Sequence, residues 1–214
     1  MPRHSILGLA LAAGLMSTPC LAQDTLKPLP YIDLSAAPSL TQKTQVRFTT
    51  DVGEVLLEIY PQAAPNAARR FLELVKLGFY DNTPLFRVVP KFVVQFGINW
   101  RGDFAKYKEK GFDDDPSVFA LEAGTLAFAK SGKNSNSSQV FINYGDNSRL
   151  ATQGAFTAFG KVISGKAVLE KFRQVGDPKM GLDQDKLWSS GEVYMKGLPK
   201  QPNMILKAEV LPAK

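Results

Sequence analysis

Two apolar segments each carry long polar side chains that could do chemistry without transferring a proton. Arg87 and Gln95 lie within the first segment, residues 86–97, and Gln139 lies within the second, residues 136–142. Arginine is always charged and presents several rigid donors, so it can stabilise an electron pair that develops during a reaction. A glutamine side chain can fix a substrate carbonyl group.

The loop between the two strands of the first segment decides whether Arg87 and Gln95 act together. Strand alternation alone could place Arg87 in solvent, as an ordinary surface arginine. If an odd loop such as residues 90–92 joins the strands, residues 87 and 95 face each other and project on the same face of the sheet. A two-residue loop would set Gln95 opposite Phe86 and separate the pair. The sequence leaves both hairpins open.

The N-terminus predicts an export signal. Arg3 supplies a positive charge, residues 6–16 form a short apolar stretch, and residues 20–22 are suited to cleavage between Ala22 and Gln23. We therefore expect residues 1–22 to be a signal peptide and the mature protein to be periplasmic or secreted. No later stretch approaches the roughly 20 apolar residues that a membrane span needs.

Removal of this peptide limits the chemistry that remains. The only cysteine, Cys20, and the only histidine, His4, leave with it. Cysteine–histidine zinc sites and histidine-activated nucleophiles are then excluded, and no cofactor is expected. Lipidation of Cys20 is disfavoured because Thr18 and Pro19 precede it. A reaction that breaks no covalent bond remains open.

The charge pattern favours a solvated surface over a nucleic-acid interface. The formal net charge is +6, or +5 without Arg3, but the basic residues are scattered instead of forming a stripe among aromatics. The acidic run of residues 113–115 lacks the spaced oxygen ligands of a calcium loop. We interpret that run as a solvated turn.

The remaining pattern predicts one folded domain. Residues 23–42 contain three prolines without sustained periodicity and indicate an extended arm or linker, which leaves residues 43–214 for the domain. We expect a mainly β fold, a closed eight-stranded antiparallel β-barrel capped by two α-helices. The expected strands are 44–50, 54–60, two around Leu85 and Val94, 124–129, 140–144, 158–163 and 203–211. The expected helices begin at Pro65 and at about Lys166, and residues 100–117 and 177–202 are expected to be loops.

One reaction that needs a fixed cation and no proton transfer is rotation about an X-Pro peptide bond. Its barrier is roughly 20 kcal/mol because twisting the amide destroys its resonance. In the twisted amide the prolyl nitrogen becomes a true acceptor, so a donor aimed at it binds the transition state better than either planar form. Arg87 is a candidate for that donor.

The two segments resemble the active-site strands of the cyclophilins, the peptidyl-prolyl cis-trans isomerases. The matching residues are Phe86, Arg87, Phe92, Gln95, Gly97, Asn136, Ser138, Gln139, Phe141 and Ile142, followed by a Phe-Gly-Lys-Val run at 159–162. The family's usual residue between the phenylalanine and the arginine is missing here. The resemblance covers most of residues 44–211 and implies a catalytic role for Arg87. It implies a substrate-binding role for Phe92, Val93, Gln95, Phe128, Ala129, Lys130, Gln139, Phe141, Leu150 and Phe156.

The resemblance also implies which polypeptides the protein acts on and how strongly it binds cyclosporin. Clients would be proline-containing unfolded or newly exported polypeptides, bound by a monomer without nucleic acid or stable membrane insertion. Arg149 stands before Leu150, where cyclophilins that bind cyclosporin tightly often have tryptophan, and Phe156 stands near a common histidine position. We therefore expect weak cyclosporin binding with retained isomerase activity.

Two other functions remain open. The same fold could hold proline-containing segments without catalysis, as a chaperone module. A polysaccharide-binding β-barrel of the cell envelope is the second alternative, with Trp100 and Trp188 as thin support.

Overall fold

The computed structural model describes residues 42–116 and 119–213. The predicted signal peptide and most of the predicted arm lie outside these ranges. The first strand begins at Thr44, close to the predicted start of the domain. In the described part of the chain, no helix is both long and apolar enough to span a bilayer.

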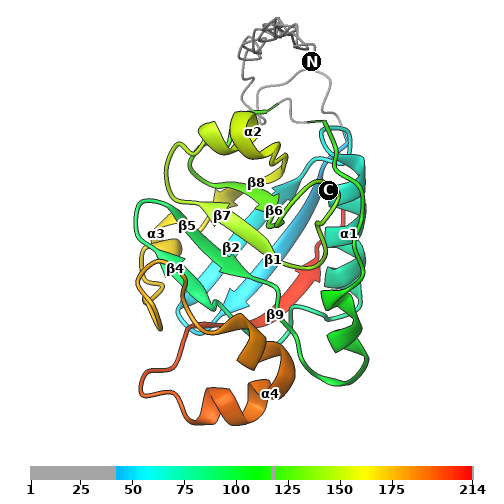
Figure 1. Cartoon of the computed structure of the whole chain (residues 1–214). Coiled ribbons are helices and arrows are strands. Elements are labelled where there is room, and N and C mark those ends of the chain that lie inside the picture. The colour runs from blue at the N-terminus through cyan, green and yellow to red at the C-terminus, as the bar shows by residue number, and fades with distance from the viewer. Residues whose placement is uncertain (1–41, 117–118, 214) are drawn as a thin grey trace, which may run out of the picture.

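One antiparallel sheet dominates the fold, in the order β3-β9-β1-β2-β8-β6-β7-β5-β4 (Figure 1). Its strands are β1 (Thr44–Thr50), β2 (Gly53–Ile59), β3 (Thr83–Pro84), β4 (Arg87–Val89), β5 (Val93–Phe96), β6 (Thr125–Phe128), β7 (Val140–Asn143), β8 (Ala158–Ser164) and β9 (Met204–Val210). The prediction of a mainly β, antiparallel, barrel-like sheet is confirmed.

The sheet has one more strand than predicted. Its two end strands are joined by the chain and not by a ladder of hydrogen bonds, unlike those of the closed barrel that was predicted. The strand expected around Leu85 is divided into β3 and β4, which are the two end strands of the sheet. Only Leu85 and Phe86 separate these strands, so the sheet must curl until its ends meet. Within the described residues no ladder pairs β3 with β4, and Pro84 has no N–H to donate. The chain itself joins the two ends of the sheet.

Strand alternation fills the interior of the curled sheet with apolar side chains. In β1 and β2, Val46, Phe48, Val55, Leu57 and Ile59 are all buried, whereas their neighbours are more exposed. Helix α1 (Pro65–Lys76) covers one opening of the sheet and buries its own apolar stripe in the same core.

The aspartates expected to form a solvated turn are partly structural. Asp113 is exposed, but Asp115 is buried and accepts hydrogen bonds from the backbone N–H groups of Asn66 (3.1 Å) and Ala67 (2.8 Å). These are first-turn donors of α1 that have no partner inside the helix. The solvated-turn prediction therefore holds for Asp113 and is wrong for Asp115, because an N-terminal helix end needs an acceptor.

The helices outside α1 differ from the prediction. The helix expected to begin at about Lys166 is only α3 (Lys166–Leu169), and two further helices are present, α2 (Arg149–Gly154) and α4 (Gln184–Lys196). A 3-10 helix, η1 (Gly102–Lys108), forms part of the predicted loop at 100–117. In Figure 1, α2 and α4 lie at opposite ends of the face formed by β7, β5 and β4.

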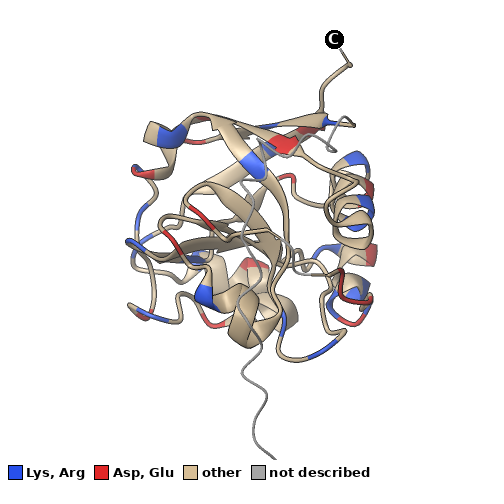
Figure 2. Cartoon of the chain, turned by 90° about the horizontal axis from the view of Figure 1, so that it is seen from above, with Lys and Arg blue, Asp and Glu red and all other residues tan. Residues whose placement is uncertain are grey.

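Charged side chains are distributed over the whole fold. Figure 2 shows Lys and Arg positions interspersed with Asp and Glu around the periphery. This distribution agrees with the scattered basic residues of the sequence and forms no single basic stripe among the described residues.

Candidate active site

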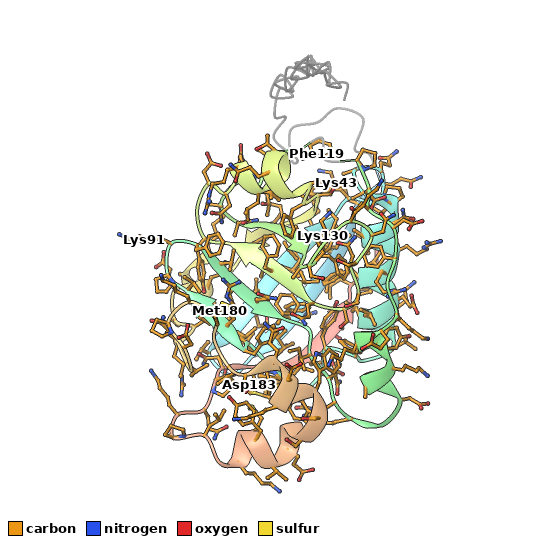
Figure 3. All side chains as sticks on the ribbon, viewed as in Figure 1. Lys43, Lys91, Phe119, Lys130, Met180 and Asp183 are labelled. Atoms are coloured by element: carbon orange, nitrogen blue, oxygen red, sulfur yellow. The ribbon has the colours of Figure 1, made fainter. Side chains whose placement is uncertain are left out.

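The β4–β5 hairpin has the odd loop that the pairing of Arg87 and Gln95 requires. Residue 87 lies directly opposite residue 95, and Val89 lies opposite Val93. Three residues, 90–92, join the strands, and Lys91 has a φ of +64° at their centre. Lys91 points outward at the tip of this hairpin in Figure 3. The two-residue alternative is therefore excluded.

A chain of hydrogen bonds fixes three polar side chains on one face of the sheet. Nη1 of Arg87 donates to Oε1 of Gln95 at 3.0 Å. Nε2 of Gln95 donates to Oε1 of Gln139 at 2.8 Å. Gln95 is paired through its backbone with Phe141 on β7, and Gln139 precedes that strand. Both polar segments of the sequence therefore meet at a single site.

A second acceptor for Arg87 comes from a distant part of the chain. Nε of Arg87 donates to the Lys179 carbonyl oxygen at 2.6 Å. The segment that carries this carbonyl lies against β4, because the N–H of Leu182 donates to the Phe86 carbonyl at 2.8 Å. Gly181 permits this approach, since a side chain at its φ of +75° would overlap the backbone of residues 86 and 87. No signal in the sequence identified Lys179, because its backbone makes the contact.

Arg87 remains charged although it is partly buried. Partial desolvation lowers the pKa of the Arg87 guanidinium, but arginine stays protonated in proteins at neutral pH. The guanidinium carbon also lies 5.6 Å from the centre of the Phe92 ring. Arg87 is thus a fixed cation at the edge of an aromatic surface. Its Nη2 makes no hydrogen bond to another described residue.

An open cavity of about 610 Å³ surrounds this group. On one side of Arg87 its wall is apolar and is formed by Phe92, Val93, Phe141, Leu150 and Phe156. The rings of Phe141 and Phe156 contact edge to face, with centroids 5.7 Å apart. This wall is concave and aromatic, and it suits a small apolar ring such as that of proline.

Phe128 does not belong to the cavity, although the resemblance placed it there. Its ring packs inside the sheet against Phe112 and Phe159, and 3% of the residue is exposed. Strand alternation explains the difference: Leu126 and Phe128 of β6 face the core, whereas Ala127 and Ala129 face the cavity side. All ten other predicted site residues line the cavity.

Lys130 lines the cavity but is held by other groups of the protein. Its Nζ lies 2.8 Å from a carboxylate oxygen of Asp114 and donates to the Ala155 carbonyl at 3.0 Å. Burial alone would raise the pKa of Asp114, but hydrogen bonds from Lys130, Asn134 and Asn136, together with the charge of Lys130, lower it. The N–H of Ala129 is also occupied, by the carbonyl of Gln139.

Comparison with known protein families identifies the family of this chain, in agreement with the geometry of the site. The family described as "Cyclophilin type peptidyl-prolyl cis-trans isomerase/CLD" matches residues 45–205. The chain belongs to this family. The match includes Arg87, Gln95, Gln139 and the apolar wall. Cyclophilins are peptidyl-prolyl cis-trans isomerases that bind proline-containing peptides.

Individual proteins agree with the family match. The chain is similar to peptidyl-prolyl cis-trans isomerase cypE of Dictyostelium discoideum, with 41% identity over 137 residues, 62% of this chain and 85% of that protein. It is 33% identical over 176 residues to a peptidyl-prolyl cis-trans isomerase of Acinetobacter baylyi, covering 78% of this chain and 85% of that one. The crystal structure of a cyclophilin-type isomerase of Cryptosporidium parvum shares the fold, with a TM-score of 0.60, 24% identity and coverage of 81% of this chain and 100% of that chain.

The remaining wall of the cavity was missed by sequence reasoning. One part is formed by Met180, Gln184, Asp185 and Trp188 from the segment predicted to be a loop, with Lys108 and Glu109 from the end of η1. Ser131, Ser135 and Ser137, from the segment before β7, complete the lining. One signal could have revealed α4: Asp183 precedes the helix, and its carboxylate accepts from the N–H of Lys186 at 3.0 Å, as an N-cap does. The cluster of Gly and Pro around the helix concealed that signal.

Proposed function

We propose that the protein accelerates X-Pro isomerisation by donating a hydrogen bond from Arg87 to the nitrogen of the twisted amide. One observation carries this proposal: Arg87 is held by two fixed acceptors beside an apolar wall, with Nη2 unengaged by the described residues. A donor fixed before the substrate arrives costs no reorganisation in the transition state.

The other groups of the site have supporting roles in this proposal. The proline ring enters the wall of Phe92, Phe141 and Leu150. Gln95 orients the guanidinium and, with Gln139, offers polar contacts to the peptide backbone. As the amide twists, its nitrogen pyramidalises and accepts from Arg87, and no covalent bond is broken and no proton is transferred.

The proposed substrates are unfolded or newly exported polypeptides with accessible X-Pro bonds. The cavity supports this choice because it is open to solvent, so an extended chain can reach it. The location that goes with it is the periplasm or the exterior, after cleavage between Ala22 and Gln23. Mass spectrometry of the N-terminus of protein recovered from cell fractions would test the cleavage, and a mature chain that begins at Met1 would contradict it.

The direct test of function is the cis-to-trans relaxation of a short X-Pro peptide with the wild-type protein and with Arg87→Ala. Acceleration by the wild type that is lost in the variant supports the proposal. A folded wild-type protein that binds the peptide without accelerating it would instead favour a non-catalytic module for proline-containing segments.

A further inference from the structure

The cavity extends well beyond the apolar wall that suits proline. That wall lies toward α2, and the opposite wall is built by the start of α4 and the end of η1. Because α2 and α4 lie at opposite ends of the β4–β5–β7 face (Figure 1), the cavity that surrounds Arg87 has a separate wall at each of these ends. A peptide that lies across β4 with its proline at the α2 end would place a neighbouring residue near the α4 end.

The second wall is part of the folded body. Leu187 of α4 is fully buried in a cluster with Phe86, Ile98, Val175 and Leu182. Gly191 lies so close to the Trp100 ring that any side chain there would overlap the indole. The helix that carries Trp188 is therefore docked on Phe86, the residue before Arg87, and on Trp100.

Two side chains give this wall an apolar character. Trp188 packs its inner face on the protein core and lines the cavity with the rest of its ring. Met180, 61% exposed, lines the cavity from the segment that leads to α4. Figure 3 labels Met180 and, farther along this segment, Asp183. The N–H of the Trp188 indole has no acceptor among the described residues, which leaves it available to a peptide carbonyl.

The charges near this wall favour an uncharged occupant. Lys108 lies 3.6 Å from Asp185, so these two groups balance each other. A cationic side chain would meet Arg87, and an anionic one would meet Glu109. An aromatic side chain avoids both costs and stacks on an indole or a thioether.

We propose that Trp188 and Met180 form a second side-chain pocket, which selects an aromatic residue next to or one position removed from the substrate proline. This specificity rests on the function proposed above. It names the substrate class: X-Pro segments with an aromatic neighbour.

The test compares five peptides. The parent contains proline among alanines, and the other four place one Phe at each of the two positions before and the two after the proline. Exchange between cis and trans is measured by NMR at equilibrium for each peptide. We expect Phe at one position to raise the catalytic efficiency about 2- to 12-fold over the parent, the range that an aromatic pair contributes. Arg or Glu at that position should not reach the value for Phe.

Variants assign the preference to the pocket. Trp188→Ala should reduce the ratio of the Phe peptide to the parent peptide toward one, and Met180→Ala should reduce it in part. Because Met180 is exposed, its variant keeps the test valid if Trp188→Ala fails to fold. The control is Val193→Ala, since Val193 is 75% exposed on the same helix, does not line the cavity, and should leave the ratio unchanged.

The outcomes separate the two proposals. If all five peptides are accelerated equally, or if Arg is preferred to Phe, the pocket proposal fails and the isomerase function stands. If no peptide is accelerated, the isomerase proposal fails, and chemical-shift titration of the same peptides then decides about the pocket. Tighter binding of one Phe peptide that depends on Trp188 would support the pocket; equal binding of all five would overturn it.

Discussion

Arg87 and Gln95 are direct cross-strand partners, and their side chains are joined at 3.0 Å on the cavity face of the sheet. Because the carbonyl of Lys179 holds the other side of the guanidinium, little freedom remains for Arg87 to turn away. The orientation of the cation is therefore set before any substrate is bound.

Replacement of Arg87 by alanine should lower kcat/KM for a short X-Pro peptide by about 10- to 150-fold. This is the range expected when a charge-assisted hydrogen bond of roughly 1.5–3 kcal/mol is lost from the transition state. Circular dichroism should show an intact fold. Arg69→Ala is the control, because Arg69 is exposed on α1 and, among the described residues, its side chain hydrogen-bonds only to Asn66. Equal rates for wild type and Arg87→Ala would remove Arg87 from the mechanism.

Gln95→Ala should reduce kcat/KM about tenfold, because the guanidinium loses one of its two acceptors. The double variant Arg87→Ala/Gln95→Ala should be scarcely slower than Arg87→Ala alone, since Gln95 acts mainly by positioning Arg87. A double-mutant cycle on peptide isomerisation measures this coupling. Additive losses would show that Gln95 acts on the substrate independently of Arg87.

Asp115→Ala should lower the free energy of unfolding by about 1–3 kcal/mol, because two N–H groups at the start of α1 lose a charged acceptor. Urea titration followed by circular dichroism would give this difference. Asp113→Ala is a matched control two residues away, with an exposed side chain, and should change stability little. Equal effects of the two substitutions would argue against the capping role.

The ion pair of Asp114 and Lys130 should make part of the free energy of unfolding depend on pH in the acid range. The folded-state pKa of Asp114 is lowered, so its contribution is present above the ordinary aspartate pKa of about 3.9 and is lost as the pH falls through the lowered value. Asp114→Asn should therefore lower stability at neutral pH and flatten its decline on acidification. Thermal unfolding between about pH 2 and pH 7 measures both effects. A variant with the same acid dependence as the wild type would contradict this assignment.

Strand period predicted that Arg87 and Gln95 would lie side by side if the loop between them was odd, and the register confirms this placement. Gln139 was placed in the site by the family resemblance. Phe128 was placed wrongly in the cavity because the family resemblance located only its strand. Side chains alternate between the two faces of a strand, and that of Phe128 points into the core. A resemblance gives the position of a strand more readily than the direction of each side chain.

The second half of the site could not be read from sequence patterns. The Lys179 carbonyl is a backbone group, and every residue type carries such a carbonyl. Helix α4 has a non-helical residue, Ser190, and a glycine, Gly191, in its interior, and these weaken its apolar period. Only the docked structure brings Trp188 to the same cavity as Arg87.

The pairing of β1 with β9 has a consequence for how the protein itself is made. β1 has β2 on one side, but on the other side it pairs with β9, the last strand of the described chain. β9 also holds β3, which leads through Leu85 and Phe86 to Arg87. A chain synthesised from its N-terminus must therefore wait for β9 before this edge can close. The cavity matures late, and each new copy becomes competent only after residues 204–210 have been made.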